Sequence, residues 1–294
     1  MITKEQIFEN LQKNNLNPEL VLALVELAIS EDLMGGTDVT SLSTIPETQI
    51  SELDLVARKK GVISGIDVAS LVFYSINSKI QINQKVKDGS EVEESQTILS
   101  AKGPTTDLLT AERTALNFLS HLSGIATLTN KWVKEVAATN ASIRDTRKTT
   151  PGLRILEKYA VRCGGGKNHR MSLNDQALIK DNHIVAAGSI LKAIEKVKDK
   201  FPELPLEIEV DNLDQLQEVL KTDIKLILLD NFTIEDLQRA VSLNNKKAKL
   251  EASGGITFEN ARKIAQTGVD YLAVGALTHS APVLDIGGDL RTVS

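Results

Sequence analysis

The sequence predicts an α/β protein in which an N-terminal α/β domain, made of a small sheet and helices, precedes an incomplete α/β barrel of about six to seven parallel strands. Its 294 residues, 41% of them hydrophobic, suffice for two modest domains with buried cores. Residues after 140 repeat an apolar run, a polar turn and a segment of helical period. Polar residues follow nearly every one of those apolar runs, and this pattern favours a barrel.

The N-terminal part is expected to begin with a pair of amphipathic helices. Up to residue 29, leucines such as Leu16, Leu20 and Leu24 recur at spacings near three and four. Residues 52–103 change to short alternating runs punctuated by Gly and Asp. This change indicates a small sheet, with a helix around residues 66–74.

A long helical stretch is expected to follow from Thr110, where good helix formers dominate and Leu116 and Leu119 offer one buried face. We expect Gly124 to break it, because glycine weakens a helix interior. The expected domains are an N-terminal α/β domain over 1–115, a catalytic barrel over 116–280, and a tail over 281–294 that returns to the N-terminal domain.

Six apolar runs in the second half are the expected barrel strands: ASIRDTRK, ALIKDNHI, LEIEVD, IKLILLD, KLEASGGI and YLAVGAL. Helical patterns separate them, so they form βαβ units with a parallel sheet. Such a sheet could be doubly wound or barrel-like. Chemistry at the carboxyl ends of many strands is typical of a barrel, whereas an open sheet concentrates it at one switch point.

Composition excludes several classes of function. With 34 Lys and Arg against 39 Asp and Glu, the net charge of −5 argues against bulk binding to nucleic acid or acidic lipid. Cys163 is the single cysteine, so no disulfide can form within the chain and a Cys-rich zinc site is excluded. The N-terminus lacks the apolar core of a signal peptide, and no apolar run approaches the roughly 20 residues that span a bilayer. A cytoplasmic protein is expected.

The segment CGGGKNHRMSL, residues 163–173, combines three glycines with basic residues. A Walker-type loop needs Ser or Thr after its lysine, but Lys167 precedes Asn168. A dinucleotide fingerprint follows a strand, whereas the residues before Cys163 have a helical pattern. A helix C-cap followed by a loop is the simplest interpretation. Cys163 itself is expected to be a packed thiol, since no base is paired with it.

The same segment lies in a strongly basic window. Residues 144–180 hold nine Lys and Arg against three acids, a net +6 in an acidic chain. A pocket for a small anion with several charges is one interpretation, because Arg forks suit carboxylates and phosphates. An exposed basic face is the other. His169 lies within this window, whereas His121 and His183 are interpreted as structural.

Acidic residues and glycines follow the later strands. Glu209 and Asp230 each end an expected strand, where they could hold Mg²⁺ or stabilise a developing cation, or simply cap the next helices. The glycines of residues 253–255 and 274–276 could offer backbone N–H groups to a phosphate, or serve ordinary loop geometry.

Taken in order, six motifs carry a resemblance to a known family: DTRKTTPGLR, GGGKNHRMSLNDQALIKDNHI, EIEVDN, LDNF, EASGGI and VGALTHS. The chain resembles the quinolinate phosphoribosyltransferase family, the nicotinate-nucleotide pyrophosphorylases of NAD biosynthesis. EDLMGGTDVTS and ERTALNFLSHLSGIAT extend the resemblance over essentially the whole chain. Thr37 before Asp38, and Glu94 with Ser95, depart from the family's glycine-containing turns, which puts the geometry of those turns in doubt.

The resemblance implies a homodimer with a shared active site, at least, and transfer of the phosphoribosyl group of phosphoribosyl pyrophosphate to quinolinate with release of pyrophosphate and CO₂. Mg²⁺ is implied, held by or near Glu209 and Asp230, and no organic cofactor. The implied catalytic residues are Lys148, Lys180, Glu209 and Asp230. The implied substrate-binding residues are these four together with Arg113 of the partner subunit, Thr146, Arg147, His169, Arg170, Ser253, Gly254, Gly255, Val274, Gly275, Ala276 and His279.

Three rival functions stay open at this point. A related phosphoribosyltransferase, such as the molybdenum-transport-associated homologue, would use a different acceptor. A lyase or aldolase would form a Schiff base on Lys180. A sugar-phosphate sensor would bind phosphoribosyl pyrophosphate without turning it over.

Overall fold

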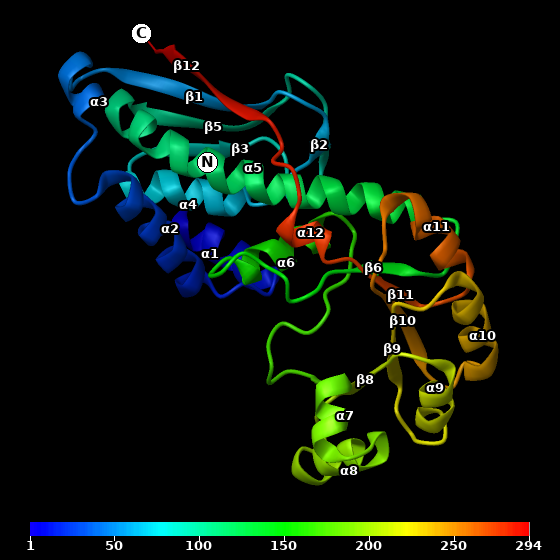
Figure 1. Ribbon diagram of the computed structural model, residues 1–294. Helices are drawn as coiled ribbons and strands as arrows, with labels where there is room; N and C mark the ends of the chain where they lie inside the picture. Colours follow the sequence, from blue (N-terminus) through cyan, green and yellow to red (C-terminus); the bar gives the residue numbers. More distant parts are fainter. Residues whose placement is uncertain (294) are drawn as a thin grey trace. The chain divides into compact units, whose positions relative to one another are not determined.

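The computed structural model describes residues 1–293 (Figure 1). The chain forms two compact units. The first comprises Met1–Asn130, Thr150–Gly165 and the residues from Ser280, and the second comprises Lys131–Thr149 and Gly166–His279. The domain boundaries expected from the sequence stay a prediction. No helix within the described residues is both long enough and apolar enough to cross a membrane.

Two helices open the first unit, as predicted: α1 (Lys4–Lys13) and α2 (Pro18–Leu33). The expected leucine face of α2 is wrong, because Leu20 is exposed and the face that packs inward carries Val21 and Val25. Thr3 begins α1 with a capping box, and the Asn17 side chain accepts hydrogen bonds at the start of α2. A short helix, α3 (Val39–Thr44), follows. Asp38 caps it through the backbone N–H of Ser41, at 3.0 Å, so the turn functions with threonine before the aspartate.

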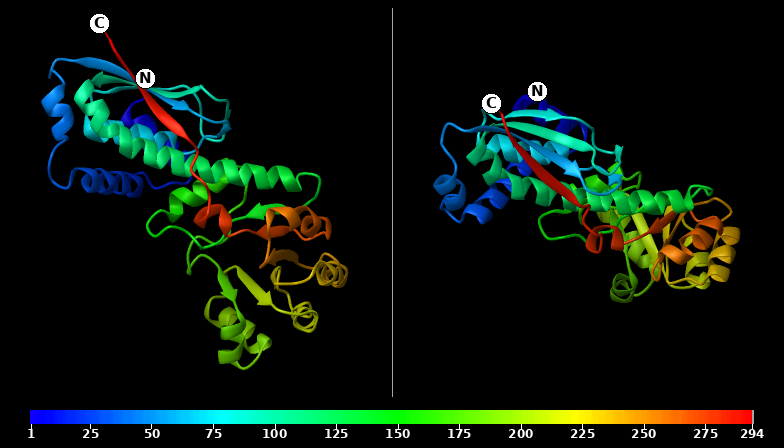
Figure 2. Two further views of the ribbon diagram at one scale, coloured as in Figure 1. Left: turned by 45° about the horizontal axis from the view of Figure 1, so that its top comes forward. Right: turned by 90° about the horizontal axis from the view of Figure 1, so that it is seen from above.

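The predicted small sheet is antiparallel, with strand order β12-β1-β5-β3 (Figure 2). Ser95 precedes β5 with φ 66°, the left-handed conformation that a glycine would adopt, so serine preserves that turn. The predicted helix near residue 66 is α4 (Ile66–Ile76), which contacts β3 and β5. The strands of this unit are β1 (Ile50–Ala57), β2 (Gly61–Val62), β3 (Gln81–Gln84), β4 (Glu91–Val92), β5 (Thr97–Pro104) and β12 (Ile286–Thr292), of which β2 and β4 form a separate pair.

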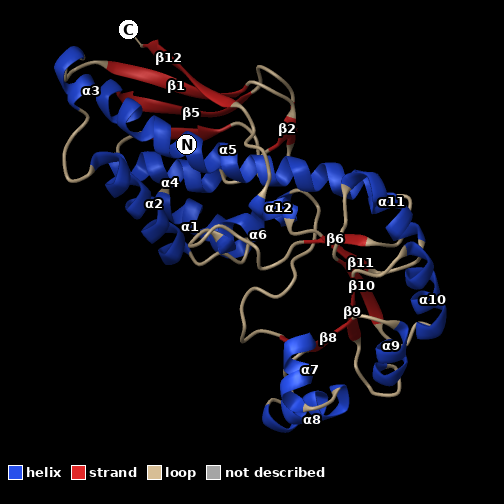
Figure 3. Cartoon of the chain, viewed as in Figure 1, coloured by secondary structure: helices blue, strands red, loops and turns tan. Residues whose placement is uncertain are grey.

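The expected break at Gly124 is wrong, because α5 (Thr105–Val136) runs through it without interruption (Figure 3). A Cβ at Gly124 would lie 2.1 Å from the carbonyl oxygen of Pro282 and 2.9 Å from the Cα of Val283. Glycine is therefore needed for close packing of another backbone segment against the helix. Glycine destabilises a helix interior by about 1 kcal/mol relative to alanine, and the packing at Gly124 offsets this cost.

Helix α6 (Arg154–Cys163) ends where the glycines of CGGG begin, as predicted. Its Tyr159 hydroxyl donates to Asp88 at 2.8 Å, and Asp88 also accepts from the backbone N–H groups of Gly65 and Ile66 that start α4. Burial raises the pKa of Asp88 to about 6 despite these donors. One carboxylate thus joins two helices of the first unit.

The second unit contains a parallel sheet of six strands, which confirms the predicted fold class. The order β6-β11-β10-β9-β8-β7 places each strand beside the next along the chain and returns β11 to β6. This is barrel order with an opening between β6 and β7. The strands are β6 (Ser142–Arg144), β7 (Ala177–Ile179), β8 (Leu206–Val210), β9 (Leu226–Asp230), β10 (Lys249–Ser253) and β11 (Tyr271–Ala273).

Helices follow the strands of this sheet, as the sequence pattern predicts (Figure 3). The apolar centres of the strands are buried, Ile208 and Ile227 completely. Polar residues such as Lys180, Asp211 and Asp230 lie at or directly after their carboxyl ends, which leaves that edge available for chemistry. The helices are α7 (Asp181–Ala187), α8 (Ile190–Lys200), α9 (Leu213–Val219), α10 (Ile234–Asn244), α11 (Phe258–Gln266) and α12 (Ala276–His279).

Candidate active site

A cavity of about 680 Å³ lies at the carboxyl ends of the parallel strands and is formed within the second unit alone. Its size is that of a small-molecule site. It brings together all the candidate residues of this unit: Thr146, Arg147, Lys148, His169, Arg170, Lys180, Glu209, Asp230, Ser253, Gly254, Gly255, Val274, Gly275, Ala276 and His279. Arg113 is exposed on α5 in the first unit and does not line this cavity, as far as residues 1–293 show. The roles of all these residues stay predictions.

The first basic group comes from the turn after β6. The backbone N–H of Lys148 donates to the Thr146 hydroxyl at 3.1 Å, and the Thr278 hydroxyl donates to the Lys148 carbonyl at 2.7 Å. These bonds hold the turn on both sides. Arg147, between them, has a buried Nε with no hydrogen-bond partner within the described part of the chain. An unpaired buried donor of a cation is suited to an anionic ligand.

The second basic group comes from the segment after the three glycines. Lys167 forms a parallel bridge with Arg144 and extends the edge of β6. Asp145, fully buried, then accepts from the Asn168 side-chain amide at 2.5 Å and from the His169 backbone N–H at 2.8 Å. The segment is therefore fixed to β6 before Arg170 reaches the cavity.

Arg147 and Arg170 are close enough for their charges to interact. Burial, and then the charge of Arg147, lowers the pKa of Arg170. Like charges brought together repel unless an anion lies between them. The two guanidinium groups therefore form a natural binding place for a carboxylate or phosphate.

The acidic side of the cavity comes directly from strand ends. Glu209 lies on β8 and Asp230 ends the neighbouring β9, so the parallel register directs both toward the same cavity. Lys180, which follows β7, forms an ion pair with Glu209. Asp230 accepts from the Asn231 side-chain amide at 2.7 Å. This side of the cavity thus combines two carboxylates, which are possible ligands for a metal ion, with the amine of Lys180.

Glycines form a third side, where backbone is exposed to the cavity. Gly254 has φ 81°, and a Cβ there would lie 2.1 Å from the Asn231 side-chain oxygen. A Cβ at Gly275 would lie 3.0 Å from Lys148 Cδ and 3.3 Å from His279 Nε2. A side chain is therefore excluded at Gly254, whereas one at Gly275 would crowd the Lys148 and His279 side chains. Gly255, at φ 60°, has no atom within 4 Å of its Cβ position.

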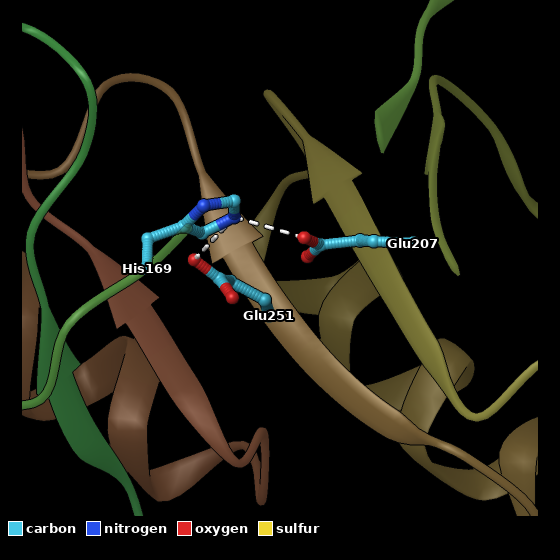
Figure 4. Close-up of side chains that lie close together, drawn as sticks. All are labelled: His169, Glu207 and Glu251. Atoms are coloured by element: carbon cyan, nitrogen blue, oxygen red, sulfur yellow. Dashed lines mark ion pairs between the residues drawn. The ribbon is translucent and has the colours of Figure 1, made fainter. Parts of the chain in front are cut away.

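His169, a predicted residue of the cavity lining, belongs to a buried cluster whose two glutamates, Glu207 and Glu251, were not predicted from the sequence. His169 Nε2 lies 2.8 Å from Glu207 Oε2 and 3.9 Å from Glu251 Oε1 (Figure 4). Arg144 Nη1 forms an ion pair with Glu251 Oε2. Burial, and then the charge of Glu207, raises the pKa of Glu251. One signal was available: Glu207 and Glu209 alternate on β8, so both face the same side of the strand.

The remaining candidates agree with structural roles. His121 Nε2 lies 2.9 Å from the buried Glu157, and His183 Nδ1 accepts from the Lys180 backbone N–H at 3.0 Å. Cys163 is half-buried, and burial raises the pKa of its thiol to about 11. The thiol therefore stays protonated near neutral pH and is a poor nucleophile.

Cationic, anionic and glycine-lined sides around the carboxyl ends of a parallel sheet define an α/β enzyme that acts on small anions. Residues 38–123 match the N-terminal domain of quinolinate phosphoribosyl transferase, and residues 125–289 match its C-terminal domain. The chain belongs to the quinolinate phosphoribosyltransferase family.

Curated relatives and solved structures agree with that assignment. The chain is 50% identical to nicotinate-nucleotide pyrophosphorylase [carboxylating] of Mycobacterium leprae, over 90% of this chain and 95% of that one. It is 40% identical to quinolinate phosphoribosyltransferase [decarboxylating] 1b of Nicotiana tabacum, over 92% and 82%. NadC from Streptococcus pyogenes superposes with a TM-score of 0.91 at 35% identity, covering 95% of this chain and 99% of that one. The nicotinate-nucleotide pyrophosphorylase from Francisella tularensis gives 0.88 at 39% identity, over 93% and 96%.

Proposed function

We propose that this protein transfers the phosphoribosyl group of phosphoribosyl pyrophosphate to quinolinate, with decarboxylation, in the de novo synthesis of NAD. The products are nicotinate mononucleotide, pyrophosphate and CO₂. The observation that carries the proposal is the cavity with an arginine side and a carboxylate side. Its relatives are named for the same reaction.

Quinolinate carries two ring carboxylates, and the basic side has the donors to bind them. Arg147 offers a buried Nε without a hydrogen-bond partner among the described residues. Arg170 lies near enough for the charge of Arg147 to lower its pKa. A dianion between the two would remove their repulsion and satisfy the open donor. Lys148 lines the same side and adds a further positive charge.

The acidic side suits the sugar. When the pyridine nitrogen forms its bond to ribose C1, the bond from C1 to pyrophosphate breaks and its electron pair leaves with pyrophosphate. Positive charge grows on the sugar as this bond stretches. Glu209 and Asp230, fixed at adjacent strand ends, would stabilise that charge more in the transition state than in the ground state. The glycine side would hold the 5′-phosphate. It consists of Ser253 to Gly255 and Val274 to Ala276, with His279 nearby.

Mg²⁺ is part of the proposal. Glu209 and Asp230 fit it, since both are carboxylates lining one cavity, the oxygen ligands that Mg²⁺ prefers. The ion pair between Lys180 and Glu209 indicates that contact could be indirect, through the pyrophosphate or water. When bound, Mg²⁺ would neutralise charge on the leaving pyrophosphate.

Decarboxylation needs no organic cofactor. Once the ring nitrogen is bonded to ribose, its positive charge stabilises the electron pair that stays on the adjacent carbon when CO₂ leaves. A proton then replaces CO₂ at that carbon. Arg147 and Arg170 would hold the ring carboxylates of quinolinate, while Glu209 and Asp230 stabilise the charge on the sugar. The two halves of the reaction would therefore use different sides of the cavity.

Lys180 is unsuited to the rival lyase chemistry. A Schiff base requires an amine that is free to attack a carbonyl group, but the Lys180 amine is held in an ion pair with Glu209. The pair of guanidinium groups likewise disfavours an acceptor with a single carboxylate. A cytoplasmic homodimer, with Arg113 of the partner subunit completing the quinolinate pocket, is part of the same proposal. Light scattering would measure the mass in solution.

One assay tests the proposal directly. The protein is incubated with quinolinate labelled in the carboxyl group next to the ring nitrogen, phosphoribosyl pyrophosphate and Mg²⁺, and labelled CO₂ and nicotinate mononucleotide are measured. Equal amounts of both products are expected. A parallel reaction with nicotinate should give no nucleotide, and a chelator should stop the quinolinate reaction. Absence of CO₂ with quinolinate would overturn the proposal.

A further inference from the structure

Two hydrogen bonds hold Arg170 in place, one to His169 and one to Gln176. The Arg170 backbone N–H donates to His169 Nδ1 at 2.8 Å. Its guanidinium Nη1 donates to the backbone carbonyl of Gln176 at 3.1 Å. The position of this guanidinium therefore depends on His169 and Gln176.

Both of these residues depend in turn on one carboxylate oxygen. His169 Nε2 lies 2.8 Å from Glu207 Oε2, and the Gln176 side-chain amide donates to the same atom at 3.0 Å. Glu207 lies on β8 and is completely buried. A central strand thus anchors the loop of residues 169–176 at both of its ends.

The hydrogen bonds also fix the tautomer of His169. Because Nδ1 accepts from a backbone N–H, the ring proton must be on Nε2, where it faces Glu207. Both ring nitrogens are then occupied by the protein. His169 lines the cavity, but it has no N–H left to donate to a substrate carboxylate.

The cluster of His169, Glu207 and Glu251 could also be viewed as a metal site, since its ligand atoms lie within 4.8 Å of one another (Figure 4). Its surroundings disagree with that view. Arg144, itself buried, already supplies a positive charge to Glu251. Glu207 Oε2 already accepts from Gln176 and faces the proton of His169. A divalent cation would displace that proton and lie beside a guanidinium group.

We propose that Glu207 is a positioning residue that fixes the Arg170 guanidinium for one carboxylate of quinolinate, acting through His169 and Gln176. This inference rests on the proposed function. A bound carboxylate would meet an arginine whose geometry is set before binding, which lowers the entropy lost on binding. Glu207 touches neither substrate in this assignment.

The test is Glu207→Gln, which keeps the shape of the side chain but turns an amide N–H₂ toward donors. We expect the Kd for quinolinate to rise at least tenfold, as expected for a lost charge-assisted hydrogen-bond network. The Kd for phosphoribosyl pyrophosphate should stay within twofold. Glu251→Gln is the matched control, because Glu251 is equally buried in the same cluster but lies 3.9 Å from His169 Nε2 and does not accept from the Gln176 amide. It should change quinolinate binding less than threefold.

A double-mutant cycle separates positioning from general damage to the fold. In the Arg170→Ala background, Glu207→Gln should weaken quinolinate binding by less than twofold further, because the group that it positions is gone. An equal loss in both backgrounds, or an equal loss for both substrates, would overturn the assignment. If Glu207→Gln does not fold, Gln176→Met removes one of the two links and should raise the quinolinate Kd at least threefold, with no change overturning the assignment.

Two further measurements distinguish the alternatives. Metal analysis of the purified protein should find no stoichiometric transition metal, and a bound metal that Glu207→Gln removes would replace positioning with a metal site. Wild-type protein in the labelled CO₂ assay tests the proposed function separately. Release of CO₂ by wild type together with unchanged quinolinate binding by Glu207→Gln would refute the positioning role alone.

Discussion

The basic and acidic sides of the cavity are built in different ways. Glu209 and Asp230 extend from strand ends, so the register of the parallel sheet places them directly. Arg147 and Arg170 lie on loops. Buried carboxylates hold the Arg170 loop, through the Asp145 contacts and the contacts of Glu207.

The two sides therefore differ in what fixes the positions of their side chains. A strand end is fixed by the sheet, whereas a loop residue needs its own buried hydrogen bonds to be fixed. Damage to the acidic side should therefore change the chemical step. Damage to the basic side should change the binding of the acceptor.

The largest effect is expected from Asp230→Asn. The amide keeps the shape but loses the negative charge that faces the sugar, so kcat should fall about 100- to 1,000-fold. The Kd for quinolinate should stay within threefold. Single-turnover kinetics with equilibrium binding would measure both, and a large loss of quinolinate affinity with kcat intact would remove the distinction between the two sides.

Arg147→Ala should have the next largest effect, on the opposite side. Loss of a charge-assisted fork to a carboxylate should raise the Kd for quinolinate about 100-fold. Phosphoribosyl pyrophosphate binding should change less than threefold. Calorimetric titration of each substrate is the measurement, and Arg147→Lys should recover only part of the affinity, because lysine cannot form the fork. Equal weakening of both substrates would contradict the assignment.

A smaller effect is expected at the glycine side. Gly254→Ala places a Cβ at φ 81° against Asn231, so we expect a loss of about 2–3 kcal/mol in unfolding free energy and a tenfold rise in the KM for phosphoribosyl pyrophosphate. Gly255→Ala is the matched control: its φ is also positive, but no atom lies within 4 Å of the new Cβ. It should cost about 1 kcal/mol. Denaturant unfolding would rank the two, and equal costs would show that the Asn231 contact is unimportant.

The smallest effect on the site is expected from Asp88→Asn, in the other unit, which should leave kcat/KM within twofold. The pKa of Asp88 is raised to about 6, so the folded state keeps a proton that the unfolded state has lost. The stability contributed by this group is fully present below about pH 4 and is lost as the pH rises through about 6.

The variant lacks that titration. Its unfolding free energy relative to wild type should therefore improve by about 2 kcal/mol between pH 4.5 and pH 7. Denaturant unfolding at the two pH values would measure this change. Parallel pH dependence in the two proteins would show that the Asp88 carboxylate is not desolvated.

The strand-end residues could be predicted from the sequence because apolar runs followed by polar residues locate the mouth of a barrel. Glu209 and Asp230 were found in that way, and the structure places both in the cavity. Glu207 and Glu251 were missed, since a glutamate within an apolar strand is read as an interruption of the pattern. Their partners, Arg144 and His169, are distant in the sequence and meet only after folding.

Helix propensity, considered alone, gave a wrong prediction at Gly124. Gly124 weakens a helix when considered alone, yet α5 is continuous, because the contact that requires glycine comes from residues 282–283. Arg113 marks another limit. Its expected role depends on a second copy of the chain, and the single chain places it exposed on α5.

The position of β12 at the edge of the antiparallel sheet affects how the protein is synthesised. β12 pairs with β1, which is made more than 200 residues earlier. During translation, one edge of β1 therefore stays unpaired until β12 has been synthesised. An unpaired edge invites pairing with other chains. Premature termination before residue 286 should consequently yield aggregation, even though every residue of the cavity would already be present.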